Sequence, residues 1–81
     1  MYYSISKVTP LNDYLLLLKF KNGEEKIFDM NPYLGTGIFK ELMDKAIFNT
    51  VKVNFDTIEW INEADMDPET LYHESIALEK I

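Results

Sequence analysis

Short apolar-rich blocks bounded by turn-forming residues fill most of the first 30 positions, a pattern that is typical of β-strands. The blocks span residues 2–9, 14–20 and 24–30 and are rich in aromatic and aliphatic side chains. An Asn-Gly pair at positions 22–23 separates the last two blocks. Because both residues tolerate the positive φ angles of a tight turn, these blocks are predicted to form a hairpin. The first part of the chain is therefore predicted to be an antiparallel three-stranded meander.

Two strand registers compete at this hairpin. A two-residue loop would place Lys19 opposite Lys26, so that two like charges would face each other. A type I turn with Gly23 in a β-bulge would instead place Lys19 opposite Glu25. Opposite charges that face each other across two strands contribute a few tenths to about 1 kcal/mol. The bulged register is therefore favoured.

An amphipathic helix is predicted over residues 38–46. Apolar side chains recur there at helical spacing, with Lys, Glu and Asp between them. The glycines before this segment, Gly35 and Gly37, are predicted to shape its start, and its apolar side is predicted to lie on the sheet.

A second hairpin is predicted over residues 51–60, where apolar and polar residues alternate. A turn at positions 56–57 would give one continuous apolar face for the helix to cover. That turn would pair apolar residues across the two strands: Val53 with Trp60 and Phe55 with Ile58.

A short helix is predicted near the C-terminus, because three helix-start signals occur together. Asp67 can cap the first turn, Pro68 suits the first helical position, and Glu69 adds a carboxylate near the positive end of the helix dipole. Four residues are predicted to face inward: Leu71, Tyr72, Ser75 and Ile76. The whole pattern predicts one α+β domain over residues 1–81, in the order three-stranded meander, helix, β-hairpin, short helix.

The composition fits a folded domain with one core, since 47% of the 81 residues are hydrophobic and 27% are charged. The sequence has no Cys and does not start with the basic segment and long apolar run of a signal peptide. Its apolar runs are far shorter than the roughly 20 residues of a membrane span. These features predict a cytoplasmic protein with no membrane partner.

Charge excludes one class of partner and suggests another. All eight basic residues are Lys and the formal net charge is −6, so direct nucleic-acid binding is not expected. Residues 56–81 carry eight acids and one Lys, a formal −7, whereas residues 1–55 carry six acids and seven Lys, a formal +1. The acidic C-terminal third is therefore predicted to attract a basic protein.

The second strand block has apolar residues on both of its faces. Leu16, Leu18 and Phe20 point one way, while Leu15 and Leu17 point the other way. One helix cannot cover both sides of a small sheet, and large exposed apolar patches are uncommon on monomers. Either the terminal segments wrap over the second side or another chain covers it, and both alternatives stay open.

Residues with catalytic or metal-binding chemistry are few. Asp65, Asp67 and Glu69 are spaced like part of a calcium loop, but the Gly and the final Glu of an EF-hand are missing, and helix capping accounts for these acids better. The single histidine, His73, has no nucleophile or orienting acid at a recognisable spacing. We therefore expect no enzymatic activity, no metal and no cofactor.

A series of short motifs runs along nearly the whole chain: Phe20-Lys21-Asn22-Gly23-Glu24, Phe28-Asp29-Met30, Phe39 to Asp44, Phe48-x-x-Val51-x-Val53, Ile58-x-Trp60 and Asp65-x-Asp67-Pro68-x-x-Leu71-Tyr72. This series resembles a small bacterial domain family of unknown function. The resemblance implies an α+β fold. It also implies relatives in which the domain precedes a helix-turn-helix DNA-binding domain, and a loose link to antitoxin-like or regulatory gene pairs. It implies no catalytic residue.

Two functional hypotheses follow. The first is a non-enzymatic protein-interaction or regulatory module, antitoxin-like in its most specific form, that binds a basic partner or associates with itself. Its predicted interaction surface joins two leucines and four acids: Leu15, Leu17, Glu63, Asp65, Asp67 and Glu69. The alternative is a small-molecule binding domain with an aromatic and carboxylate cleft that includes Trp60. That residue alternates in phase with Ile58, however, which favours a place in the core.

Overall fold

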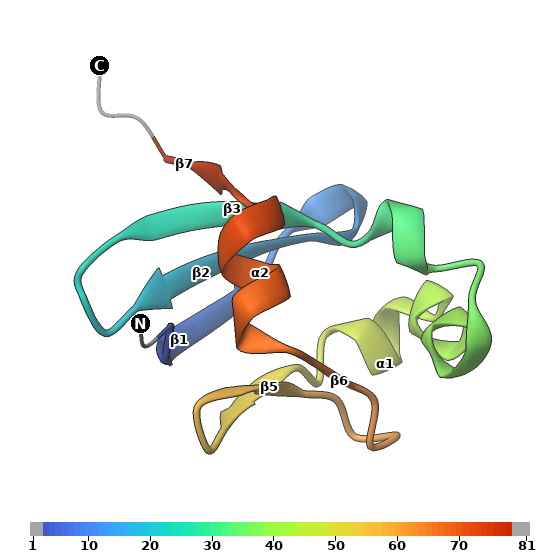
Figure 1. Ribbon diagram of the computed structural model, residues 1–81. Coiled ribbons are helices and arrows are strands. Elements are labelled where there is room, and N and C mark those ends of the chain that lie inside the picture. Colours follow the sequence, from blue (N-terminus) through green and yellow to red (C-terminus); the bar gives the residue numbers. More distant parts are fainter. Residues whose placement is uncertain (1–2, 79–81) are drawn as a thin grey trace.

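Two antiparallel sheets and two short α-helices make up the computed structural model, which describes residues 3–78 (Figure 1). The first sheet has the strand order β1-β2-β3-β7, formed by Ile5–Pro10, Leu15–Phe20, Glu25–Asp29 and Ile76–Ala77. The second sheet has the order β4-β5-β6, formed by Lys52–Asn54, Thr57–Glu59 and Asp65–Met66. The α+β class is confirmed, with the strands divided between two sheets.

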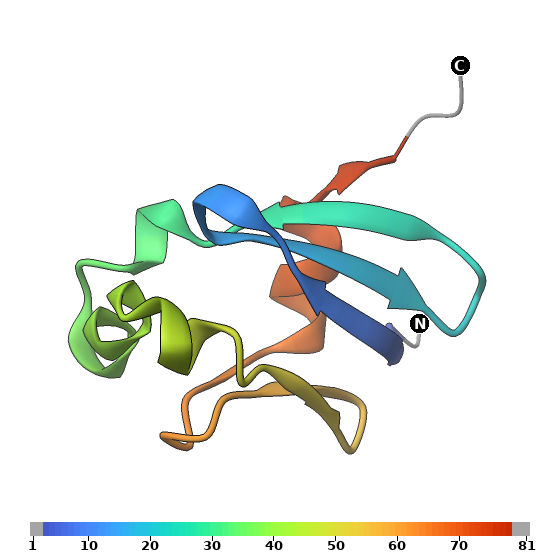
Figure 2. The same cartoon turned by 180° about the vertical axis from the view of Figure 1, so that it is seen from behind.

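Helical segments connect these strands. The 3₁₀ helix η1 (Asn12–Tyr14) joins β1 to β2, and η2 (Asn31–Tyr33) follows β3. A longer 3₁₀ segment, η3 (Gly37–Met43), and α1 (Lys45–Phe48) lead to β4, and α2 (Pro68–Glu74) lies between β6 and β7. Helix α2 lies across one face of the four-stranded sheet, which we call the inner face (Figure 1). The opposite face, which we call the outer face, is turned to the viewer in Figure 2. Neither α2 nor the second sheet lies over it.

The predicted meander and its register are confirmed. Strands β1, β2 and β3 are antiparallel neighbours, and Lys19 lies opposite Glu25. Gly23 adopts a φ of 93°, and its N–H donates to the carbonyl of Phe20. This is a conformation that glycine adopts without the steric cost that other residues incur.

The second hairpin turns one residue earlier than predicted. Val53 lies opposite Ile58, so residues 55–56 form the turn. The predicted pairs of Val53 with Trp60 and of Phe55 with Ile58 are therefore wrong. Phe55 instead occupies the turn with a φ of 56°, and 90% of it is exposed.

The reason lies in contacts that the turn makes with distant residues. The carbonyl of Asp56 accepts a hydrogen bond from the Ile5 N–H at 3.2 Å. Its carboxylate lies 3.6 Å from the Nζ of Lys21. Both contacts tie the turn to the four-stranded sheet, and neither can be read from the local alternation of residues 51–60.

The middle helix differs from the prediction for residues 38–46. The chain is 3₁₀-helical up to Met43 and then α-helical from residue 45, with a break at Asp44, whose ψ is 113°. The Asp44 carboxylate accepts a hydrogen bond from the Ala46 N–H at 2.9 Å and so caps α1. Because an Asp side chain that bonds to the backbone starts a helix better than it continues one, the segment is split in two. In the 3₁₀ part, Ile38 and Met43 are 45% and 52% exposed, so the apolar side of the predicted helix is not fully turned inward.

The C-terminal helix begins as predicted but ends before Ile76. The Asp67 carboxylate accepts from the Thr70 N–H at 3.3 Å, and Leu71 is fully buried. The helix stops at Glu74, and the chain then leaves as β7. The prediction that Ile76 faces inward is wrong, because this residue is in an edge strand and is 76% exposed.

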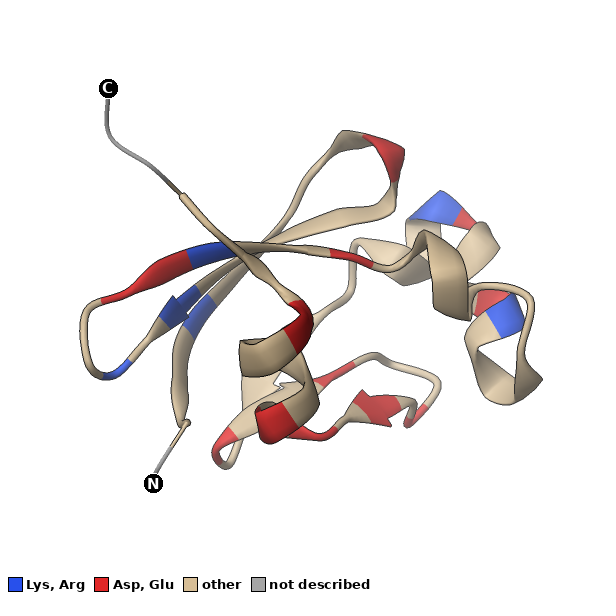
Figure 3. Cartoon of the chain, turned by 45° about the horizontal axis from the view of Figure 1, so that its top comes forward, with Lys and Arg blue, Asp and Glu red and all other residues tan. Residues whose placement is uncertain are grey.

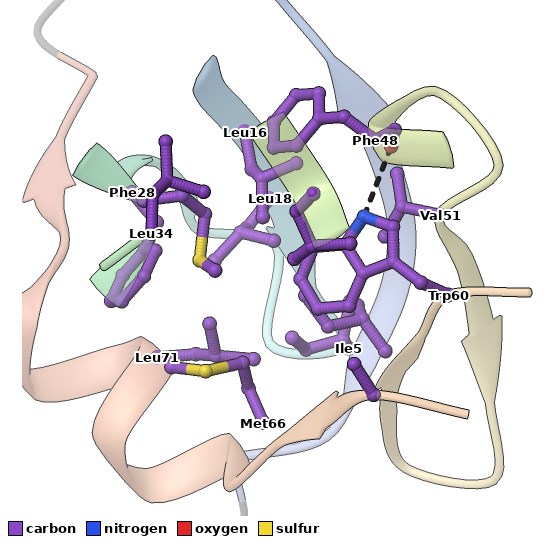
Figure 4. Close-up of a cluster of buried hydrophobic side chains, with 14 of the residues drawn as sticks. Ile5, Leu16, Leu18, Phe28, Leu34, Phe48, Val51, Trp60, Met66 and Leu71 are labelled. Atoms are coloured by element: carbon purple, nitrogen blue, oxygen red, sulfur yellow. Dashed lines mark hydrogen bonds between the residues drawn. The ribbon is translucent and has the colours of Figure 1, made fainter. Parts of the chain in front are cut away.

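The core lies between the inner face, α2 and the second sheet (Figure 4). Trp60 is only 1% exposed, and its indole N–H donates to the carbonyl of Phe48 at 3.0 Å. The interpretation of Trp60 as a core residue is confirmed. Other large side chains that are fully buried come from both sheets and α2: Phe20, Phe28, Ile5, Leu16, Leu18, Ile58 and Leu71.

Candidate interaction surfaces

The outer face of the four-stranded sheet is the first candidate surface. Its middle row crosses all four strands, because Thr9, Leu17, Ile27 and Ile76 are successive register partners. Residues directly opposite each other in a ladder lie on the same side of a sheet. Leu15 belongs to the same face, and both it and Leu17 are half-buried. The two leucines predicted for an interaction surface thus lie together on this face.

The described C-terminal segment does not wrap over the outer face. It extends the sheet sideways, because Ile76 lies opposite Ile27 and the Leu78 N–H donates to the carbonyl of Glu25 at 2.9 Å. Ile76 is 76% exposed and Leu78 is 48% exposed. At the other terminus, Tyr3 stacks on Tyr72 of α2, which covers the inner face. Residues 1–2 and 79–81 lie outside the described part of the chain.

One end of the outer face is charged and hollowed. Lys19 lies between Lys7 and Glu25 in the ladder. These three residues, together with Thr9 and Leu17, line a hollow of about 130 Å³. Sites for small molecules usually have volumes of roughly 300–1,000 Å³, so this hollow is the size of a side chain and not of a typical ligand.

The four predicted acids form a second candidate surface, which we call the acidic surface (Figure 3). Glu63 lies in the turn between β5 and β6, Asp65 lies in β6, and Asp67 and Glu69 lie at the start of α2. All four are found away from the outer face, so the structure does not bring these acids together with the two leucines. The single combined surface expected from the sequence is instead two separate surfaces.

Asp65 of the acidic surface is one member of a pair of like charges. Glu59 and Asp65 are directly opposite each other on β5 and β6, which is destabilising in a sheet. Glu59 also lies opposite Lys52 and accepts a hydrogen bond from the side chain of Asn54 at 2.6 Å. Between residues 56 and 78 the sequence has seven acids and no Lys or Arg. Lys52 and Asn54 therefore offset the charge of Glu59, whereas no basic residue of this segment offsets the charge of Asp65.

Tyr72 holds α2 against the hairpin of β2 and β3. Its hydroxyl donates to the carboxylate of Glu24 at 2.6 Å, and the Nζ of Lys26 lies 3.8 Å from the centre of its ring. The hydrogen bonds from Tyr72 and from Asn22 lower the pKa of Glu24 below its ordinary value. The same bond raises the pKa of Tyr72, because ionisation would remove the donated proton. These shifts accompany a structural contact at the edge of the inner face.

The aromatic cleft of the alternative hypothesis does not form around Trp60, because this residue is buried and its N–H is already bonded. A second hollow, beside η1, is lined in part by Tyr14 and Phe48 and measures only about 60 Å³. His73 is exposed, and its ring lies edge-on to two tyrosine rings. Among residues 3–78 there is no group of three potential metal ligands.

Two exposed residues of the outer face were missed by the sequence reasoning. Ile76 and Leu78 were not expected there, because the helical pattern was carried on as far as position 76. The alternation of Ile76, Ala77 and Leu78 is the signal that could have revealed a strand, but it spans only three positions. Phe55 and Ile61, which are 90% and 73% exposed, are further apolar residues that local periodicity does not place.

Comparisons with known proteins bear on the family alone. In the described part of the chain, no helix has the length and apolar character needed to cross a membrane. Neither a curated protein nor a solved structure matches the sequence. A family model with the description "Protein of unknown function (DUF2442)" matches residues 5–77, a range that contains the acidic surface and all of the outer face except Leu78. The chain therefore belongs to DUF2442, a family of proteins of unknown function.

Proposed function

We propose that the protein is a non-enzymatic interaction module that docks another protein chain on the outer face of its four-stranded sheet. One observation carries this proposal: Ile76 is 76% exposed although it lies opposite Ile27 in the ladder. The last described strand thus enlarges an apolar face that nothing in residues 3–78 covers. Large contiguous apolar patches are uncommon on the surfaces of monomers, and where they occur they usually mark interaction sites.

The arrangement of the face supports a protein as its partner. Aliphatic side chains of β2, β3 and β7 occupy its middle, and Lys7, Lys19 and Glu25 lie at one end. Protein interfaces have this division into an apolar centre and a polar rim. Covering the centre would stabilise the complex by about 25 cal/mol for each Å² of apolar surface removed from water. Ile76 and Leu78 have the most exposed surface to contribute.

The non-enzymatic part of the proposal rests on the shape of the surface. The two hollows described above, about 130 and 60 Å³, are smaller than the usual volumes of substrate pockets. The exposed imidazole of His73 packs on tyrosine rings and not beside a nucleophile. We place the module in the cytoplasm, a proposal supported by the absence of Cys from the sequence.

A second candidate function is favoured by the like-charge pair of Glu59 and Asp65. A Lys or Arg from a basic partner would relieve this repulsion, and Glu63, Asp67 and Glu69 would extend the contact. Neutralisation of a basic protein in an antitoxin-like manner is the most specific form of this function. It uses the acidic surface and leaves the outer face free, so the two candidate functions can be tested separately.

Affinity purification from the cells that produce the protein tests the first function. The variant Ile76→Ser removes an exposed apolar group from the outer face, and Ile61→Ser removes a similarly exposed one from the turn between β5 and β6. A bound protein, or a second copy, that is lost from Ile76→Ser and kept by Ile61→Ser is the expected result. Equal capture by the two variants would contradict docking on the outer face.

Salt and charge variants test the second function. A partner held by the acidic surface should elute as the salt concentration rises, because exposed charges are screened beyond about 10 Å at roughly 0.1 M salt. Asp65→Asn and Glu69→Gln should weaken its binding, whereas Asp13→Asn, which removes an acid from η1, should leave binding unchanged. Binding that resists salt and all three substitutions would rule out this function.

A further inference from the structure

We infer that the chain covering the outer face is a second copy of this chain, packed face to face around a twofold axis that runs between β2 and β3, parallel to the strands. This inference rests on the proposed function and specifies its partner. Such an axis lays β2 of one copy over β3 of the other, and β1 over β7, because the strand order is β1-β2-β3-β7. The charges and the shape of the face both select this arrangement.

The charges of the outer face complement each other across this axis. Lys19 and Glu25 are neighbours in one row, on either side of the axis. In the dimer the Lys19 of each copy lies over the Glu25 of the other, so that four charges alternate in sign around the axis. With Lys7 and Asp29 included, the face carries two positive and two negative groups. A balanced face gives little electrostatic advantage to a strongly charged foreign partner and suits an identical one.

The shape of the face complements itself around the same axis. The hollow of about 130 Å³ lies on the β1 side, where Lys7, Thr9 and Leu17 line it. The exposed aliphatic side chains, Ile76 and Leu78, lie on the β7 side. The twofold axis brings these side chains over the hollow of the other copy. A dry cavity of roughly 150 Å³ accepts a group as large as benzene, so the hollow has room for one aliphatic side chain.

A twofold axis perpendicular to the strands would fit the surface less well. It would place each strand over the same strand of the other copy. Glu25 would then lie over Asp29 on β3, bringing carboxylates together. Ile76 would meet Ile76, and neither hollow would receive it. Like charges and an unfilled hollow both disfavour this arrangement.

The size of the face sets the expected strength of the dimer. Four strands about 4.8 Å apart, with two or three outward residues each at roughly 6.7 Å spacing, span a projected area of about 300–400 Å² per copy. A standard-size interface buries about 800 Å² of accessible surface per partner. We therefore expect a reversible dimer with a dissociation constant between about 1 µM and 1 mM.

Sedimentation equilibrium between about 10 µM and 1 mM protein tests the dimer directly. The apparent mass of the natural chain should rise from 9.5 kDa towards twice that value. Ile76→Ser should remain monomeric over the range, with an unchanged circular dichroism spectrum. The matched variant Ile61→Ser should associate like the natural chain, since it alters an equally exposed residue far from the outer face.

Charge reversal tests the pairing across the axis. Lys19→Glu gives a chain with two acids at these positions, and Glu25→Lys gives a chain with two lysines. Each variant alone should dissociate about tenfold more readily, because like charges then meet across the axis. An equimolar mixture of the two should form a heterodimer, and the double variant Lys19→Glu/Glu25→Lys should regain the dimer of the natural chain.

The outcomes separate this inference from the proposed function. A natural chain that stays at 9.5 kDa up to 1 mM overturns the second copy as the partner. The proposed function survives that result if a different protein is lost from Ile76→Ser in the affinity purification. A dimer that persists in Ile76→Ser lies on another surface and overturns this inference. Charge variants that fail to recover on mixing overturn the placement of the axis between β2 and β3.

Discussion

The two faces of the four-stranded sheet are built from alternate residues of the same strands, yet their surroundings differ. On β2, Leu16 and Leu18 point to the inner face and are fully buried. Leu15 and Leu17 point to the outer face and stay half-buried, with no described element above them. The aliphatic content of a strand therefore does not identify the core side. That side is decided by the path of the later chain, because α2 and the second sheet both return to the inner face (Figure 1).

The largest difference in stability between substitutions on the two faces should appear at two adjacent leucines of β2, Leu17 and Leu18. Leu18→Ala removes a side chain with 0% exposure and should destabilise the fold by about 2–5 kcal/mol. The total stability expected for 81 residues is only about 4–12 kcal/mol, so this loss is a large part of it. Leu17→Ala should cost about 1 kcal/mol or less, since its side chain is only half-buried.

Urea denaturation at low protein concentration checks this prediction without a contribution from association. The inner variant should unfold at a much lower urea concentration than the outer variant. Equal losses of stability would mean that the outer face is covered within the monomer. The inferred contrast between a covered inner face and an uncovered outer face would then be wrong.

Two lysines of the same hairpin sharpen the comparison for charged residues. Lys26 belongs to the inner face, where its Nζ donates to the Tyr72 carbonyl at 2.8 Å and lies over the ring of that residue. Lys26→Ala should destabilise the fold by about 1–2 kcal/mol, because it removes a charged hydrogen bond and a cation–π contact. Lys19→Ala on the outer face should cost less than about 0.5 kcal/mol. Thermal unfolding of both variants gives the ranking, and a larger effect for Lys19 would contradict it.

A third test asks whether an exposed apolar residue outside the outer face favours folding. Phe55 is 90% exposed and has a φ of 56°, in a region that costs a residue with a Cβ atom about 1–2 kcal/mol. Asn tolerates this region better, so Phe55→Asn should stabilise the fold by about 0.5–1 kcal/mol. Phe55→Leu keeps the strain and should give no gain. A loss of stability in Phe55→Asn, measured by urea denaturation, would show that the ring makes contacts that outweigh the strain.

Local signals were sufficient for the parts of the fold that depend on neighbouring residues. The Asn22-Gly23 turn, the opposition of Lys19 to Glu25 and the cap at Asp67 were all predicted correctly. Each depends on residues that are close in sequence or on one tight turn. The same holds for Trp60, whose alternation with Ile58 placed it in the core.

Features that depend on distant contacts were not predicted. The turn at Phe55 is fixed by the bond from Ile5 to Asp56, which joins two sheets. Strand β7 forms because β3 offers a free edge to Ile76, and no local pattern shows that edge. For the same reason the sequence could show that Leu15 and Leu17 give their strand a second apolar face. It could not show that this face lies apart from the acidic surface.

The last test concerns the edge where the covered face meets solvent. Tyr72 lowers the pKa of Glu24 by donating a hydrogen bond to its carboxylate. The ionised Glu24 therefore adds stability above its ordinary pKa, and this contribution is lost as the pH falls through the lowered pKa of the folded state. Tyr72→Phe should move the pKa of Glu24 back towards its ordinary value and shrink this acid-dependent part of the stability.

Titration of the Glu24 side-chain carboxyl by NMR measures the pKa directly. The matched control is Tyr33→Phe, which removes the hydroxyl group that donates to Glu74 and should leave the pKa of Glu24 unchanged. If Glu24 keeps its lowered pKa in Tyr72→Phe, the bond from Asn22 is sufficient to hold it. Tyr72 would then secure α2 to the inner face through its ring contacts alone. Helix α2 would in that case be held on the inner face by packing. The difference between the two faces would then not depend on the hydrogen bond between Tyr72 and Glu24.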